Sequence, residues 1–300
     1  MQLEVLKRRM NFSDFHQEML YKNKVGFLGE KKFHERLKRE LNSDVIQLYD
    51  VKLRAGESEC QIDCLLIFQY ECVILELKNY GGNFVMRNND WFLISGKQID
   101  NPVNQLQRQR VRLEKFFEEN KINLKINQKL VFINPKFVLY EAKRDFNVIM
   151  PGQIDWLIEE LNRIPCRVYE HQQKIVDTIQ TKSLKKSRYE TDLDYEYDRL
   201  FKGITCVTCE SFVEFDFDVS RKKVQCPKCG ESELVDAAVL RNIKDYIILF
   251  PEEQLTVGRM LDWMGFILSK QQIRRILNKY GAKQGSGRKT YYVIDNNKLN

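Results

Sequence analysis

The chain has few histidines and no long apolar run. Only three of its 300 residues are histidines, and none has metal-motif spacing, which argues against hydrolases built on histidine ligands. No apolar run approaches the roughly 20 residues of a membrane span, and the amino terminus lacks the apolar stretch of a signal peptide. We therefore expect a cytoplasmic protein without a membrane segment. No internal repeat of solenoid period is present either.

The composition is that of a globular chain, and its basic surplus lies at one end. With 43% hydrophobic and 30% charged residues, the length fits two or three domains at roughly 150 residues each. Residues 241–300 hold eleven Lys or Arg and five acids, which is +6 of the net +7. This carboxyl-terminal segment is therefore where the chain can meet phosphates.

Helical and strand patterns alternate over the first half of the chain, which predicts an α/β fold. Apolar residues at helical spacing indicate helices, and short runs of β-branched and other apolar residues indicate strands. The predicted elements, in order, are one or two helices over 11–41, strands over 44–53, 61–68 and 72–77, a hairpin of 84–86 and 91–94, a helix from 101 to 119, and strands over 130–133 and 148–150.

Three charged residues lie within or directly after two of the predicted strands. Glu76 and Lys78 are two residues apart, so on a strand both side chains project to one face. Taken alone, this pair fits a surface salt bridge on an edge strand. Asp63, however, interrupts a second apolar strand, where a carboxylate is least expected. Carboxylates on a rigid frame bind the divalent cations that assist phosphodiester cleavage, and a lysine can orient water or neutralise developing charge.

Five short motifs occur in a family order around these residues. They are Gly29-Glu30, Gln61-Ile62-Asp63, Glu76-Leu77-Lys78-Asn79-Tyr80 followed by glycine, Trp91, and Asn101-Pro102-x-x-Gln105.

Together these motifs resemble the nuclease-related domain, or NERD, family over roughly residues 24–135. The family is similar to restriction-endonuclease-like nucleases, so the resemblance implies a mixed sheet flanked by helices. It implies that Asp63 and Glu76 bind Mg²⁺ or Mn²⁺ and that Glu30 assists the metal. It also implies that Lys78 positions water and that Gln105 orients substrate or a neighbouring side chain.

The eight cysteines fall into two groups. Four are isolated and predicted to be reduced thiols: Cys60, Cys64, Cys72 and Cys166. The other four form two C-x-x-C pairs separated by sixteen residues, Cys206 with Cys209 and Cys226 with Cys229. This spacing is typical of a zinc ribbon, and four thiolates leave zinc no open position, so the site is predicted to be structural. Redox cysteines or unconnected thiols are the alternatives.

Three helices and a strand are predicted after the cysteine pairs, over residues 236–250, 257–264, 269–280 and 291–294. Ser269 and Gln272 have capping-box spacing at the start of the third helix. This order resembles a winged helix-turn-helix, whose third helix enters the major groove while a basic loop reaches phosphates. A protein-interaction module of similar topology is the alternative. The predicted nucleic-acid contacts are Gln271, Gln272, Arg274, Arg275, Lys279, Lys283, Arg288 and Lys289.

The sequence thus predicts four segments. They are a nuclease-like domain (1–175), a helical linker (176–202), a zinc ribbon (203–235) and a winged-helix-like module (236–300). The predicted function is metal-dependent hydrolysis of DNA, with Mg²⁺ or Mn²⁺ in the active site and structural Zn²⁺. The alternatives are a non-catalytic nucleic-acid-binding or regulatory protein that uses the same scaffold, and a protein-interaction adaptor.

Overall fold

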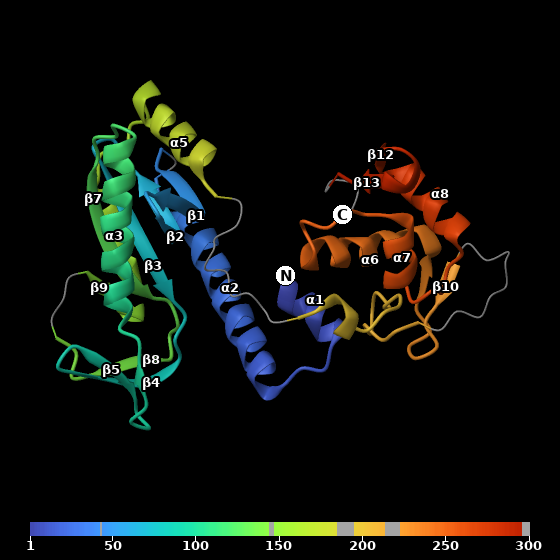
Figure 1. Ribbon diagram of the computed structural model, residues 1–300. Coiled ribbons are helices and arrows are strands. Elements are labelled where there is room, and N and C mark those ends of the chain that lie inside the picture. Colours follow the sequence, from blue (N-terminus) through green and yellow to red (C-terminus); the bar gives the residue numbers. More distant parts are fainter. Residues whose placement is uncertain (43, 144–146, 185–194, 214–222, 296–300) are drawn as a thin grey trace. The chain divides into compact units, whose positions relative to one another are not determined.

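A computed structural model describes residues 1–42, 44–143, 147–184, 195–213 and 223–295 (Figure 1). The chain forms two compact units, one of residues 21–192 and one that joins residues 1–20 to residues 193–300. The chain therefore begins in the second unit, forms the first, and then returns. This differs from the predicted 1–175 domain, because the first twenty residues pack with the carboxyl-terminal part of the chain.

The unit of residues 21–192 contains a mixed five-stranded sheet, as predicted. The strands follow the order β1-β2-β3-β7-β9; β1, β2 and β3 are antiparallel neighbours, whereas β7 runs parallel to β3 and to β9. These strands are β1 (Ile46–Ala55), β2 (Ser58–Ile67), β3 (Glu71–Lys78), β7 (Lys125–Phe132) and β9 (Val148–Ile149).

A second sheet of four strands lies in the same unit and was not predicted. It has the order β6-β5-β4-β8, and the predicted hairpin is its β4–β5 pair. The strands are β4 (Gly82–Arg87), β5 (Asp90–Leu93), β6 (Gln98–Ile99) and β8 (Phe137–Tyr140).

Helices cover both faces of the five-stranded sheet, because each face is apolar. On one face α3 (Pro102–Glu119) and α5 (Glu170–Lys182) bury side chains such as Leu113 and Ile175. On the other face α2 (Asp14–Glu40) and α4 (Ile154–Asn162), which follows the short η1 (Pro151–Gln153), do the same with Leu37 and Leu157.

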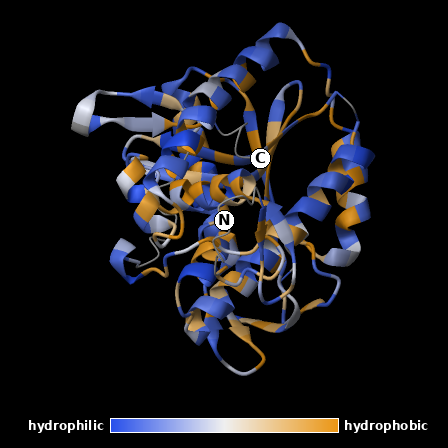
Figure 2. Cartoon of the chain, turned by 90° about the vertical axis from the view of Figure 1, so that its right-hand side faces the viewer, coloured by the Kyte–Doolittle hydropathy of each residue, from blue (hydrophilic) through white to orange (hydrophobic). Residues whose placement is uncertain are grey.

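The covering helices are amphipathic, and hydrophilic and hydrophobic stretches alternate along the ribbons in Figure 2.

The predicted linker begins at residue 176. In the structure Val176 and Ile179 of α5 are instead buried in the core beside the sheet.

The β1–β2 ladder is interrupted at one point, which lies beside the predicted active site. Its register skips the pair of Asp50 opposite Asp63, and Asp50 has a left-handed φ of 50°. In a regular strand Ile62 and Leu65 would face opposite sides, yet both belong to the same core. The backbone is therefore kinked at Asp63, so that a carboxylate interrupts the apolar alternation without entering a core.

The smaller unit carries the cysteine pairs, the three predicted helices and two hairpins. The predicted helices are confirmed to within one residue as α6 (Val235–Leu249), α7 (Val257–Trp263) and α8 (Lys270–Tyr280). The remaining elements are η2 (Tyr197–Arg199), the hairpin β10 (Lys223–Gln225) with β11 (Ser232–Leu234), and the hairpin β12 (Ala282–Gln284) with β13 (Tyr291–Val293), which encloses η3 (Gly287–Lys289). The strand pattern of Val213 to Val219 falls almost entirely outside the described residues.

A helix at the amino terminus, α1 (Gln2–Arg9), belongs to this smaller unit and was not predicted. Its Arg9 is fully buried. The guanidinium donates to the carbonyl of Gly203 at 2.8 Å and to Asn242 Oδ1 at 2.5 Å, and it lies over the Trp263 ring at 4.2 Å. A buried arginine needs such partners, so this network fixes α1 to α6 and α7.

Candidate functional site

The acid, acid and lysine of the predicted active site lie together, Asp63 in the middle of β2 and Glu76 and Lys78 at the end of β3. Lys78 Nζ lies 2.6 Å from Glu76 Oε1 and 2.9 Å from Gln105 Oε1, so the helix α3 reaches the strand through Gln105. Asp63 Oδ2 accepts the backbone N–H of Leu77 at 2.9 Å, which places its carboxylate beside Glu76. Four of the five predicted catalytic residues are thus linked by two hydrogen bonds between side chains and one hydrogen bond to the backbone.

Glu30 comes from the opposite side of the sheet, on α2, and the preceding glycine explains its approach. A Cβ atom on Gly29 would lie 2.4 Å from Asn79 Nδ2, closer than any real Cβ contact. The Asn79 amide donates to the carbonyl of Val25 at 2.8 Å, so α2 is hydrogen-bonded to the residue that follows Lys78. Glycine at position 29 therefore allows the helix to lie close to the end of β3.

The charges of this group affect one another strongly. Burial raises the pKa of Glu30, and the neighbouring Glu76 charge raises it further. Burial and Glu76 also raise the pKa of Asp63 well above its usual range. Burial alone would lower the pKa of Lys78, but the contact with Glu76 outweighs it and raises the pKa, so the lysine remains a cation.

Two further residues belong to this site, although the sequence motifs did not single them out. Gln109 is buried and donates through Nε2 to Glu76 Oε2 at 2.5 Å and to the carbonyl of Gln61 at 2.8 Å. Asp50, opposite Asp63, accepts from Gln61 Nε2 at 2.7 Å, and its charge raises the pKa of Glu30. The spacing of Gln109, one helical turn after Gln105, was a signal that could have identified it.

The donor chemistry of these carboxylates fits a hard divalent cation. Oxygen ligands are what Mg²⁺ and Mn²⁺ prefer, and carboxylates that raise one another's pKa are stabilised by a cation between them. In the described part of the chain these carboxylates are not gathered as tightly as the four cysteine sulfurs are. Asp63, Glu76 and Glu30 are the residues that could hold such a cation.

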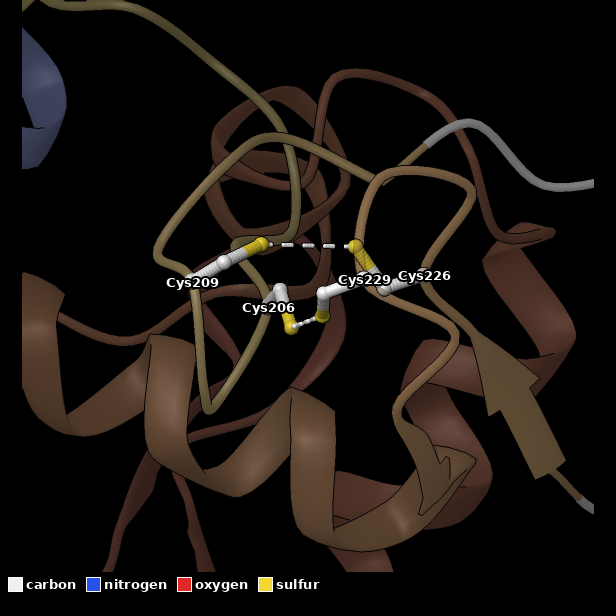
Figure 3. Close-up of side chains that lie close together, drawn as sticks. All are labelled: Cys206, Cys209, Cys226 and Cys229. Carbon is white, nitrogen blue, oxygen red and sulfur yellow. Dashed lines mark hydrogen bonds between the residues drawn. The ribbon is translucent and has the colours of Figure 1, made fainter.

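The four paired cysteines form a compact cluster whose sulfurs point toward one another (Figure 3). All four sulfur atoms lie within 4.8 Å of one another. The Sγ atoms are 3.6 Å apart for Cys206 and Cys229 and 3.5 Å apart for Cys209 and Cys226. Tetrahedral zinc with Zn–S bonds of about 2.3 Å requires sulfurs about 3.8 Å apart. The two closest pairs are near this spacing, so the cluster could bind zinc, and it differs from the four other cysteines, which are isolated.

Each pair of cysteines sits in the same type of backbone turn. The N–H of Cys206 donates to the carbonyl of Ser211 and the N–H of Cys226 to that of Glu231, both at 2.8 Å. Each turn also has a left-handed residue directly after its second cysteine, Glu210 with φ 59° and Gly230 with φ 75°. Two equivalent turns that present two sulfurs each are the geometry of a four-cysteine metal site.

Three of the predicted nucleic-acid contacts on α8 are held by other residues of the chain. Arg275 and Lys279 both bind Asp236 of α6, at 2.5 Å and 3.0 Å. Gln272 accepts the N–H of Ser269 at 2.8 Å and so completes the predicted capping box. The side chain of Arg288 lies outside the described residues. Gln271, Arg274, Lys283 and Lys289 are exposed, and so are Arg275 and Lys279 despite their ion pairs with Asp236.

Comparison with known proteins gives one match, to a family model. No curated protein and no solved structure matches this chain. Within the residues that the structure describes, no helix has the length and apolarity to cross a membrane. One family model does match: residues 25–133, the segment that carries Glu30, Asp63, Glu76, Lys78 and Gln105, match the model of the nuclease-related domain, NERD.

Proposed function

We propose that this protein is a divalent-metal-dependent nuclease that hydrolyses phosphodiester bonds of DNA. The observation that carries the proposal is the convergence of Asp63, Glu76 and Lys78, with Lys78 Nζ 2.6 Å from Glu76 Oε1, inside the segment that matches the nuclease-related domain. Carboxylates from two neighbouring strands can hold a divalent metal ion for phosphodiester hydrolysis, and a lysine beside them can offset the charge that develops.

Each residue of the site has a separate role in the proposed reaction. Asp63 and Glu76 would hold Mg²⁺ or Mn²⁺ with help from Glu30, and the ion would stabilise charge on the phosphate and lower the pKa of water. Lys78, which stays protonated, orients the attacking water and offsets the charge that develops on the phosphate. Gln105 accepts a hydrogen bond from Lys78 at 2.9 Å and thereby fixes the position of its ammonium group.

The carboxyl-terminal modules would bring this site to its substrate. In the proposed arrangement the cysteine cluster is a structural zinc ribbon, and α6, α7, α8 and the β12–β13 hairpin form a winged helix. The isolated antiparallel bridge between Leu255 and Tyr292 supports this assignment, because it pairs the segment before α7 with the hairpin. The exposed Arg274 on α8 and Lys283 and Lys289 in the hairpin would then contact phosphates.

One observation favours a second candidate function, that of a nucleic-acid-binding protein without catalysis. Both oxygens of Glu76 already accept hydrogen bonds, from Lys78 and from Gln109. A metal ion would have to use the remaining lone pairs of these oxygens. If it does not bind, the same scaffold still presents a basic carboxyl-terminal surface.

A cleavage assay separates the two functions. The protein is incubated with plasmid, single-stranded DNA and RNA in Mg²⁺ or Mn²⁺, beside Asp63→Ala and Lys78→Ala and the exposed control variants Asp44→Ala and Lys97→Ala. We expect DNA cleavage that falls by about 10²- to 10³-fold in the two site variants, the usual effect of removing one preorganised charge. Cleavage that persists in both would refute the site, and salt-sensitive binding without cleavage would favour the second function.

A further inference from the structure

We infer that Gln109 is a positioning residue that holds the Glu76 carboxylate so that Oε1 is the oxygen presented to the metal ion. This inference rests on the proposed function, because it concerns the metal ligand of the same site. It assigns a role to a residue of α3 outside the motifs.

In the described part of the chain, the Gln109 side chain makes hydrogen bonds only through its donor group, Nε2. Its Nε2 group donates to Glu76 Oε2 at 2.5 Å and to the carbonyl of Gln61 at 2.8 Å. Its Oε1 atom is buried and has no hydrogen-bond partner in the described part of the chain. An unpaired buried acceptor costs stability, so a glutamine selected for core packing alone is a poor choice here. Its contribution to the site is the two N–H groups of Nε2, one donated to Gln61 of β2 and the other to Glu76 of β3.

The two strands need this link because their own pairing has ended. The β2–β3 ladder runs only as far as the pair of Cys64 and Leu75. Beyond it, Asp63 is joined to β3 through the N–H of Leu77, and Glu76 is joined to β2 through Gln109 and the carbonyl of Gln61. These two bridges replace the missing ladder bonds and set the distance between the two carboxylates.

The same contacts distinguish the two oxygens of Glu76. The hydrogen bond from Gln109 to Oε2 is fully buried, whereas the one from Lys78 to Oε1 is only partly buried. Oε1 therefore lies on the side of the partly exposed Lys78, and we take this as the side from which an ion enters. Gln109 thereby favours coordination through a single oxygen of Glu76, and without it only the contact with Lys78 holds the carboxylate.

The test measures metal binding directly on the full, zinc-loaded chain. Mn²⁺ affinity is measured by isothermal titration calorimetry for the wild type and for Gln109→Met, which keeps the length of the side chain but has no donor. Gln107→Met on the same helix is the control, because Gln107 is exposed. We expect Mn²⁺ binding to weaken by about 10- to 100-fold in Gln109→Met, the usual cost of losing a partner of a metal ligand, and to be unchanged in Gln107→Met.

The outcomes separate this inference from the proposed function. A folded Gln109→Met with wild-type Mn²⁺ affinity overturns the role of Gln109 and leaves the nuclease proposal intact. A wild-type chain that binds no Mn²⁺ overturns both. If Gln109→Met does not fold, Gln109→Asn, which retains the amide on a shorter side chain, is measured in its place and is expected to weaken binding in the same direction. Loss of folding in both variants would assign Gln109 to the core and also overturn the inference.

Discussion

Two glycines of α2 allow the packing of this helix to be tested, because their variants to alanine are expected to change the stability of the protein in opposite directions. A Cβ atom added at Gly29 would lie 2.4 Å from Asn79 Nδ2 and 2.7 Å from its Cγ atom, whereas one added at Gly26 would meet nothing closer than 3.9 Å, at Glu30 Oε1. Both residues lie inside the helix, so both variants to alanine gain about 1 kcal/mol of helix propensity. Only Gly29→Ala also introduces a steric conflict.

The size of that conflict follows from the contacts of Asn79. To make room, its amide must leave the Val25 carbonyl, which it contacts at 2.8 Å, and the loss of such a hydrogen bond costs about 0.5–1.5 kcal/mol. Overpacking of the helix against β3 costs about 1–3 kcal/mol more. After the propensity gain, Gly29→Ala should be destabilised by about 1–3 kcal/mol, and Gly26→Ala should be stabilised by up to about 1 kcal/mol.

Differential scanning calorimetry of the full chain measures the two variants against the wild type. A unit of this size changes its midpoint by roughly 2–4 °C per kcal/mol, so the midpoints of the two variants should differ by at least about 2 °C. The Mn²⁺ affinity of Gly29→Ala should also fall, because the displaced helix carries Glu30. Equal midpoints for Gly26→Ala and Gly29→Ala would refute the close approach of α2 to β3.

Three further changes test the other parts of the molecule. Cys226→Ser should remove a zinc content near one per chain, measured by atomic emission, and unfold the cluster, since the metal supplies its folding free energy. Arg9→Met should destabilise the smaller unit by at least about 2 kcal/mol in thermal melting, because buried acceptors lose their donor at about 1–3 kcal/mol each. Asp236→Asn should release Arg275 and Lys279, and we expect tighter DNA binding in fluorescence anisotropy with a steeper dependence on salt.

Each of these changes has a matched control and an outcome that contradicts it. Cys166→Ser alters an isolated cysteine and should leave zinc content unchanged; a folded, metal-free wild type would exclude the ribbon. Arg39→Met alters an arginine whose side chain is 70% exposed, and equal melting of the two arginine variants would contradict the role of Arg9. DNA binding that weakens in Asp236→Asn would show that the acid supports the binding surface rather than neutralising it.

The elements of the five-stranded sheet were predicted well because their signals are local. The strands around Asp63 and Glu76 are apolar runs bounded by turn residues, and their pairing partners are neighbours in sequence. The second sheet was missed for the opposite reason. Its β8 pairs with β4 across more than fifty residues, and strands of two to four residues carry little periodicity of their own.

The position of the amino-terminal helix also could not be predicted. Residues 2–9 fit a short amphipathic helix as well as an irregular segment. The choice depends on Arg9, whose partners Gly203 and Asn242 lie about two hundred residues further along the chain. No local pattern encodes such a contact, because it exists only once the chain has returned to the smaller unit.

By itself the sequence determined which residues could do chemistry. Covalent spacing fixes where two cysteines of a turn or two charged residues of one strand point, so the four thiols and the Glu76–Lys78 pair were identified before any fold was known. Only the tertiary structure decided how distant groups meet. It brought Glu30 to the strands through the space at Gly29, and it placed Gln109 on the second oxygen of Glu76. The physical reason is that these contacts depend on packing between helix and sheet, which local geometry does not specify.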